Sequence, residues 1–138
     1  MGIKQISVFL ENNTGRLAEV TKCLADAGIN LRAISIADTA EFGILRVIVD
    51  KQDEAINALL DSGFTTVEND VLVVEIKDMP GSLAKLMLLF READVNIEYL
   101  YASLEGREGS AAVIFKLSNF GTGLKIIKEN GIKLLEQF

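Results

Sequence analysis

The stretch NNTGRLAEVTKCLADAGINL (residues 12–31) has a counterpart in DMPGSLAKLMLLFREADVNI (residues 78–97). A shift of 66 residues superimposes the glycine, the leucine two positions after it and the asparagine near the end of each stretch. The superimposed pairs are Gly15 with Gly81, Leu17 with Leu83, and Asn30 with Asn96. A repeat of this length indicates that one supersecondary unit occurs twice. We therefore expect two similar domains, residues 1–68 and residues 69–138.

Each copy has the pattern of strand, helix, strand, strand, helix and strand. In the first copy, alternating apolar residues predict strands, and apolar residues at helical spacing predict a helix that Gly28 ends. The predicted strands are residues 3–10, 29–37, 44–49 and 64–67, the predicted helices begin near residues 17 and 51, and the second copy repeats this order over residues 71–138. This βαββαβ order predicts an α+β fold of two ferredoxin-like units in tandem, each with its helices on one face of an antiparallel sheet.

The two units are expected to pack side by side. A domain of about 60 residues is only marginally stable alone, and the link between the copies, residues 68–70, is short. The first predicted helix of the second copy has more apolar residues than the single stripe that packs on its own sheet. We therefore expect Leu88 or Leu89 to contact the neighbouring copy or another subunit. This helix and the exposed sheet edges favour a homodimer.

Composition excludes several classes of function. The chain has 138 residues, a net charge of −6, one cysteine and no histidine. The negative charge argues against a nucleic-acid partner, and no apolar run approaches the roughly 18 residues that cross a membrane. Without histidine, Ser-His and Cys-His catalysis is excluded, so we expect no enzyme, no metal and no cofactor. Cys23 is expected to be a packing residue, and a lone cysteine agrees with a cytoplasmic location.

The loop before the first helix of each copy is a candidate binding site. A helix that starts directly after a glycine leaves backbone N–H groups open at its positive end, where a carboxylate binds well. Short side chains lie beside both glycines: Asn12, Asn13 and Thr14 in the first copy, and Asp78, Pro80 and Ser82 in the second. Asn12, Thr14 and Asp78 are also good capping or turn residues, so the residues alone leave helix capping and ligand binding open.

Asn30 and Asn96 are the second candidate feature. Each lies fifteen positions after its glycine, where we expect it just inside the second strand, and strand interiors disfavour asparagine. An asparagine amide can accept a hydrogen bond from an ammonium group and donate one to a carboxylate, the two groups of a free amino acid. Alternatively, these amides satisfy the backbone of a helix-to-strand turn.

The two stretches resemble the ACT domain, a small regulatory module of amino-acid metabolism. The shared pattern is Asp or Asn, any residue, Pro or Thr, Gly, any residue and Leu, followed by a helix that leads to an asparagine between aliphatic residues. The resemblance implies modules side by side, with small effectors, commonly amino acids, at the seam between them. By motif, it implies the binding positions Asn12, Thr14, Gly15, Arg16, Leu17, Asn30, Asp78, Pro80, Gly81, Ser82, Leu83 and Asn96, with backbone N–H groups offered by the residues after each glycine.

Two positions depart from the family pattern. Thr14 replaces the usual proline, and Asp94 replaces the glycine before the second strand of the second copy. In addition, Asp78 brings a negative charge to the place where a ligand carboxylate would lie. We therefore expect the two copies to hold unequal sites.

The resulting hypothesis is a regulatory protein that senses a small effector, an amino acid, at the interface of two ACT-like domains and modulates a partner enzyme. The alternative is a structural or interaction subunit without a ligand, which acts through homo- or hetero-oligomerisation. An enzyme that uses paired carboxylates and Arg46 is a third, disfavoured possibility.

Overall fold

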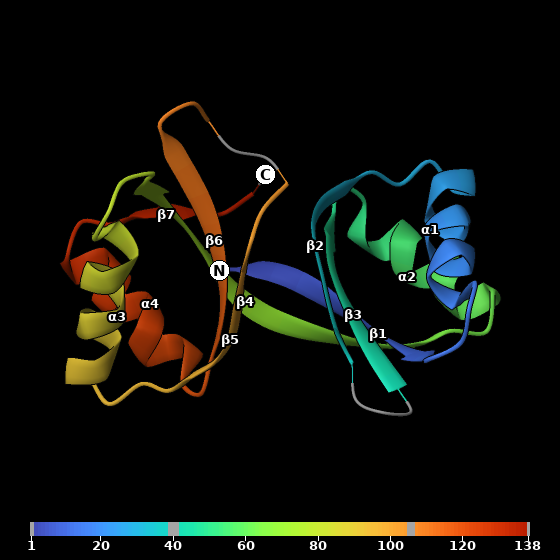
Figure 1. The fold of residues 1–138 in the computed structure, drawn as a ribbon, viewed down its shortest axis with the longest axis horizontal. Coiled ribbons are helices and arrows are strands. Elements are labelled where there is room, and N and C mark those ends of the chain that lie inside the picture. Colours follow the sequence, from blue (N-terminus) through green and yellow to red (C-terminus); the bar gives the residue numbers. More distant parts are fainter. Residues whose placement is uncertain (1, 39–41, 105–106, 138) are drawn as a thin grey trace. The chain divides into compact units, whose positions relative to one another are not determined.

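The computed structural model describes residues 2–38, 42–104 and 107–137, and it divides the chain into two compact units (Figure 1). The first unit comprises Lys4–Asn69, and the second comprises Asp70–Phe138 together with Met1–Ile3. Both units mix helices with antiparallel strands, which confirms the α+β prediction.

The first unit has the predicted order of elements. These are β1 (Ile3–Glu11), α1 (Arg16–Asp26), β2 (Leu31–Asp38), β3 (Phe42–Val49), α2 (Gln52–Asp61) and the beginning of β4 (Thr65–Lys77). The strands lie in the order β2-β3-β1-β4, and β3 is antiparallel to both of its neighbours. Figure 1 shows α1 and α2 together on one face of this sheet.

The second unit repeats the arrangement. The end of β4 is followed by α3 (Ser82–Glu92), β5 (Ile97–Ala102), β6 (Ser110–Leu117), α4 (Phe120–Glu129) and β7 (Lys133–Leu135). The strands lie in the order β5-β6-β4-β7 and each pair is antiparallel. Helices α3 and α4 again lie together on one side (Figure 1). The prediction of two tandem ferredoxin-like units is confirmed.

Strand β4 differs from the prediction. The sequence predicts a strand that ends at residue 67 and a link over residues 68–70, but β4 runs without interruption from Thr65 to Lys77. The three polar residues of the predicted link therefore lie inside a strand. One of them, Asn69, accepts a hydrogen bond from the Ser7 hydroxyl at 2.9 Å. This bond ties its part of β4 to β1, so tertiary pairing overrides the low strand propensity of asparagine and aspartate.

Each unit has its own apolar core. In the second unit, the rings of Phe90 and Phe115 meet edge to face with centroids 5.5 Å apart, which is a favourable aromatic geometry. In the first unit, the prediction that one set of residues of β1 shares a buried face is confirmed, since this set lies in one cluster with residues of α1: Ile6, Val8, Leu10, Val20 and Leu24. The strand is not half-exposed along its whole length, because Gln5 and Ser7 on the other face are also buried.

All four helices end in the same way. The residue after the C-terminal cap has a positive φ, and its N–H group and the next one bond back to the last turn, as in a Schellman motif. That residue is Gly28 after α1, Gly63 after α2 and Gly131 after α4, but Asp94 after α3, with φ of 57°. Left-handed backbone costs most residues with a side chain about 1–2 kcal/mol, which is why glycine is usual there. Within the described ranges, Asp94 is the only non-glycine residue with a positive φ.

Gly123 of α4 is packed too closely for a side chain. A Cβ at this position would lie 2.2 Å from Leu117 Cδ1 and 3.1 Å from Leu72 Cδ1, and both leucines are buried. We expect Gly123→Ala to lower the free energy of unfolding by about 1–3 kcal/mol, the usual cost of overpacking, in urea denaturation. The control is Gly121→Ala in the same helix, where a Cβ meets only Asn119 Oδ1 at 3.7 Å. This control should leave stability unchanged or raise it, and equal losses would contradict the packing argument.

Glu75 and Lys133 form an ion pair between β4 and β7, with Nζ 2.7 Å from Oε2. The hydrogen bond from Lys133 is the main cause of a lowered pKa of Glu75, and Arg107 contributes through its charge. Because the folded pKa is lowered, the pair stabilises the fold above the ordinary carboxyl pKa, and this contribution is lost as the pH falls through the folded pKa. We expect Lys133→Met to raise the pKa of Glu75 in an NMR titration of the side-chain carboxyl group. Lys125→Met, which removes the exposed pair with Glu129, should leave that pKa unchanged.

Candidate functional site

The loops that precede α1 and α3 have the same backbone conformation. The first loop contains three backbone hydrogen bonds, and each has a counterpart in the second loop. In the first loop, Asn13 N–H donates to Glu11 O (2.8 Å), Arg16 N–H to Asn13 O (3.3 Å) and Glu19 N–H to Gly15 O (2.9 Å). In the second loop, the corresponding bonds run from Met79 N–H to Lys77 O (3.0 Å), from Ser82 N–H to Met79 O (3.3 Å) and from Lys85 N–H to Gly81 O (3.0 Å). The loops are therefore repeated in structure as well as in sequence.

Each loop enters its helix through a glycine with left-handed backbone. Gly15 and Gly81 both have φ of 91°. A Cβ on either residue would meet no heavy atom within 4 Å beyond the adjoining chain. Only glycine adopts this φ readily, and the open space lets another molecule approach the backbone at the start of the helix.

Neither α1 nor α3 begins with a side-chain cap in the part of the chain that the structure describes. The alternative that Asn12, Thr14 or Asp78 caps these helices is therefore wrong. Helix α4 shows the contrast, because Asn119 Oδ1 accepts a hydrogen bond from the Thr122 N–H group at 3.0 Å. No side chain therefore bonds to the backbone N–H groups at the start of α1 or α3, whereas a side chain does so at the start of α4.

The open donors are the N–H groups of the second and third residues of each helix. The N–H groups of Arg16 and Ser82 are already bonded within the loops, so these two predicted donors are engaged. Sequence reasoning missed the third helical residues, although the general rule that the first turn lacks backbone partners was an available signal. The N–H groups without a hydrogen-bond partner among the described residues are those of Leu17, Ala18, Leu83 and Ala84.

Arg16 makes the first loop different from the second. Its Nη1 lies 2.6 Å from Glu19 Oε2, and its guanidinium carbon lies 4.8 Å from the centre of the Phe64 ring. Together with Phe9 and other residues it lines a cavity of about 200 Å³. Ser82 takes this position in the second copy, so the two helix starts carry different charges.

The second loop is anchored through Asp78. Its N–H group donates to the Gly109 carbonyl at 3.0 Å, and its side chain is exposed, as is that of Pro80. Ser82 lines a groove of about 840 Å³ along α3, which also includes Leu88. Of the predicted loop residues of the second copy, Ser82 therefore borders this open groove.

Asn30 and Asn96 lie one residue before their strands, not inside them as predicted. Their backbones are held by matching pairs of hydrogen bonds. Asn30 N–H donates to Asp50 Oδ1 at 3.0 Å and Asn30 O accepts from Asp50 N–H at 3.2 Å. Asn96 N–H donates to Ser118 Oγ at 3.0 Å and Asn96 O accepts from Ser118 N–H at 2.9 Å. Both side chains are exposed and form no hydrogen bond with any described residue, so the turn-satisfying alternative is wrong.

Within one unit, the loop and the asparagine lie at opposite ends of a helix. Helix α3 has 11 residues and is therefore about 16 Å long. Gly81 precedes this helix and Asn96 follows it, and Gly15 and Asn30 are separated by α1 in the same way. A small ligand cannot contact both ends of one helix. The seam that the family resemblance implies stays a prediction.

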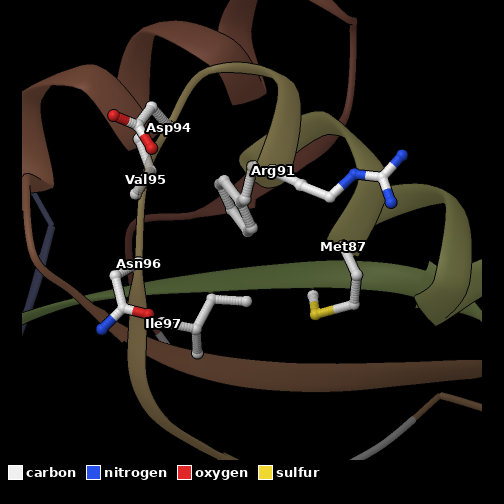
Figure 2. A pocket seen from close by; sticks show the side chains of 7 residues that line it. Met87, Arg91, Asp94, Val95, Asn96 and Ile97 are labelled. Carbon is white, nitrogen blue, oxygen red and sulfur yellow. The ribbon is translucent and has the colours of Figure 1, made fainter.

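A separate pocket of about 380 Å³ lies at the C-terminal end of α3 (Figure 2). Of its lining residues, sequence reasoning named Asn96 as a site residue and Asp94 only as a departure from the family pattern. It missed the helical residues, because their spacing is also that of an ordinary amphipathic helix. The lining residues are Met87, Phe90, Arg91, Asp94, Val95, Asn96 and Ile97.

Other kinds of site find no support in the described ranges. No group of three or more histidine, cysteine, aspartate or glutamate residues there is arranged to hold a metal ion. No helix in these ranges has the length and apolar character needed to span a membrane. Cys23 is half-buried, with Sγ 3.2 Å from Ser62 Oγ and 3.3 Å from the Ala58 carbonyl, as expected of a packing residue.

We compared the sequence and the fold of the chain with those of known proteins. No curated protein matches the sequence. A crystal structure of a protein from Bacteroides thetaiotaomicron is 41% identical with a TM-score of 0.92, over 98% of this chain and 92% of that chain. Regulatory subunits of aspartate kinase share the fold at 21% identity, over 91% of this chain and 90% of theirs: one from Thermus thermophilus in its ligand-free form (TM-score 0.66) and one from Thermus flavus (0.63). A family model described as an ACT domain pair matches residues 1–137, and the chain therefore belongs to the ACT domain pair family.

Proposed function

We propose that this chain is a regulatory protein that binds a free amino acid, or a similar small effector, and modulates a partner enzyme. The observation that carries the proposal is the repeated helix start, where a glycine with φ of 91° leads into N–H groups that no described residue engages. Membership of the ACT domain pair family supports a regulatory role and not a catalytic one.

The chemistry of the helix starts suits a carboxylate. Adjacent backbone N–H groups point out of the positive end of the helix, and together they bind an anion without any basic side chain. This matters in a chain of net charge −6, because the site itself must attract the carboxylate. The exposed amides of Asn30 and Asn96 offer a second kind of contact, in which oxygen accepts from an ammonium group and nitrogen donates to a carboxylate.

The proposed mode of action is a shift of populations. An effector favours the conformation that it binds more tightly, and a partner that distinguishes the conformations reads the change. The regulatory subunits of aspartate kinase from Thermus have the same fold, which makes a metabolic enzyme the proposed partner here. Homodimer formation and a cytoplasmic location belong to the same proposal and stay predictions.

An exposed leucine favours a second candidate function. Leu88 of α3 is 46% exposed, whereas the neighbouring Leu89 packs against the core of the second unit. Met79 is exposed on the same groove along α3, and exposed apolar residues grouped on one concave surface favour an interaction subunit that binds a partner without an effector. Under that function, Leu88→Ala weakens partner binding while Asn30→Ala and Asn96→Ala have no effect.

The proposal is tested by isothermal titration of the protein with the twenty amino acids and their keto-acid precursors. We expect at least one compound to bind at millimolar concentration or below. Asn30→Ala or Asn96→Ala should weaken that binding about 10- to 100-fold, the worth of one hydrogen bond to a charged group. Gln52→Ala is the control, because that side-chain amide lies in α2, outside both candidate loops, and donates to Glu68 in the described structure. If no compound binds at millimolar concentration, the proposal fails.

A further prediction concerns the glycines before the uncapped N-terminal ends of α1 and α3. A methyl group on the glycine would shield the adjacent N–H groups, so Gly15→Ala or Gly81→Ala should weaken binding at its own site about tenfold, the loss of one hydrogen bond. Each change also costs about 1–2 kcal/mol of stability, because φ is positive. Two control variants have the same backbone cost in the unit that lacks the tested glycine: Gly131→Ala, with φ of 64°, for Gly15→Ala, and Gly63→Ala, with φ of 86°, for Gly81→Ala. Titration and thermal denaturation of the four variants separate the two effects, and an equal loss of binding in a variant and its control would contradict the prediction.

A further inference from the structure

We propose that the pocket at the C-terminal end of α3 selects α-amino acids with an aliphatic side chain, and that Asp94 binds their ammonium group. The inference deepens the proposed function and rests on it, because Asn96 belongs to both. It adds a ligand class and a residue, Asp94, that the repeated motif does not supply.

The backbone of Asp94 is the first reason for this assignment. Four helices end in the same hydrogen-bonded motif, and three of them place glycine at the left-handed position: Gly28, Gly63 and Gly131. Asp94 alone carries a side chain there, with φ of 57°. Residues held in an unfavourable backbone conformation often have a role other than stability. At this site, the exception places a carboxylate at the edge of a pocket.

The electrostatic surroundings favour a cation beside Asp94. Its carboxylate is exposed and makes no ion pair or hydrogen bond with any residue in the described ranges. It follows the C-terminal end of α3, where the helix dipole adds partial negative charge. Asn96 lies two residues further along the chain, and both its backbone N–H group and its carbonyl group form hydrogen bonds with Ser118. In Figure 2 the Asp94 and Asn96 side chains lie on the same side of the pocket, opposite Met87. On the proposed assignment, the ammonium group of the ligand contacts Asp94 and the Asn96 amide donates to the carboxylate of the same ligand.

The rest of the pocket favours an aliphatic side chain. Val95 and Ile97 extend from the strand side, and Met87 extends from the helix toward them (Figure 2). Phe90, which is fully buried, is the fourth apolar residue of the lining. Arg91 points away from Asp94 in the view of Figure 2, so a cation lies on the far side of the apolar surface. A basic ligand side chain that extends in that direction meets a like charge, which disfavours lysine and arginine.

The first unit lacks this combination. Positions 66 residues earlier than Asp94, Arg91 and Met87 hold Gly28, Ala25 and Thr21. The asparagine is common to both copies, but the carboxylate, the guanidinium group and the methionine are not. The site is therefore assigned to the second unit alone.

Methionine methyl NMR tests the site directly. The chain has three methionines, of which Met87 lines this pocket and Met79 lines the groove along α3. In the full chain labelled at the methionine methyl carbons, L-leucine should shift the Met87 resonance in a saturable way and leave Met79 in place. The variant Met87→Leu identifies the resonance. As a probe without an ammonium group, 4-methylpentanoate should bind at least about tenfold more weakly, and L-lysine should also be weaker than L-leucine.

Substitution of Asp94 is the decisive comparison. Asp94→Gly restores the residue of the first copy, so the melting temperature should stay the same or rise. Affinity for L-leucine should fall about 10- to 100-fold. Glu92→Gln is the matched control: it removes one exposed carboxylate from the same helix, outside this pocket, and should bind L-leucine like the wild type.

The outcomes separate this inference from the proposed function. If L-leucine leaves Met87 unchanged, or if Asp94→Gly binds L-leucine as tightly as the wild type, the inference is overturned. The proposed function survives either result as long as any amino acid binds in the calorimetric titration. If no amino acid binds in that titration, both fail.

Discussion

The fold depends on how the backbone enters and leaves its helices. In both copies the chain passes from a strand to a helix at a glycine with φ of 91°, and it leaves the helix through a second left-handed residue. The entry turn admits no side-chain cap from its own residue, because glycine has none. The exit turn directs the chain into the next strand by two hydrogen bonds to the last helical turn. These two turns determine where backbone polar groups are open and where side chains gather around a pocket.

The order of elements was predictable from the sequence because it depends on local patterns. Ile6, Val8 and Leu10 alternate as a half-buried strand requires, and Gly28 and Gly63 mark helix ends by a backbone preference that acts within a few residues. The continuity of β4 was not predictable in the same way. Glu68, Asn69 and Asp70 have the composition of a link, and they become part of a strand through partners that are distant in sequence, such as Ser7.

The candidate site was predictable only in part, for a related reason. The motif correctly placed Gly15 and Gly81 directly before their helices, but whether a nearby side chain caps the helix depends on loop geometry that sequence spacing leaves open. The pocket beside Asp94 requires a helix end and a strand start to lie together. Met87 and Arg91 are four residues apart on α3, a spacing that is typical of any helix, so no sequence signal separated them from ordinary surface or core residues. Asp94 carried the one available signal, as an aspartate at a position where glycine is expected.

The difference between Gly28 and Asp94 has a consequence for how such a protein responds to concentration. Duplication produced two equivalent helix ends, and only one of them carries the acidic residue. On the proposed assignment each chain takes up one molecule of an aliphatic amino acid at this pocket, and not two. Occupancy of a single independent site rises hyperbolically with ligand concentration. The pocket in an isolated chain therefore fills gradually as the concentration of the amino acid rises. A threshold response would require several chains to act together.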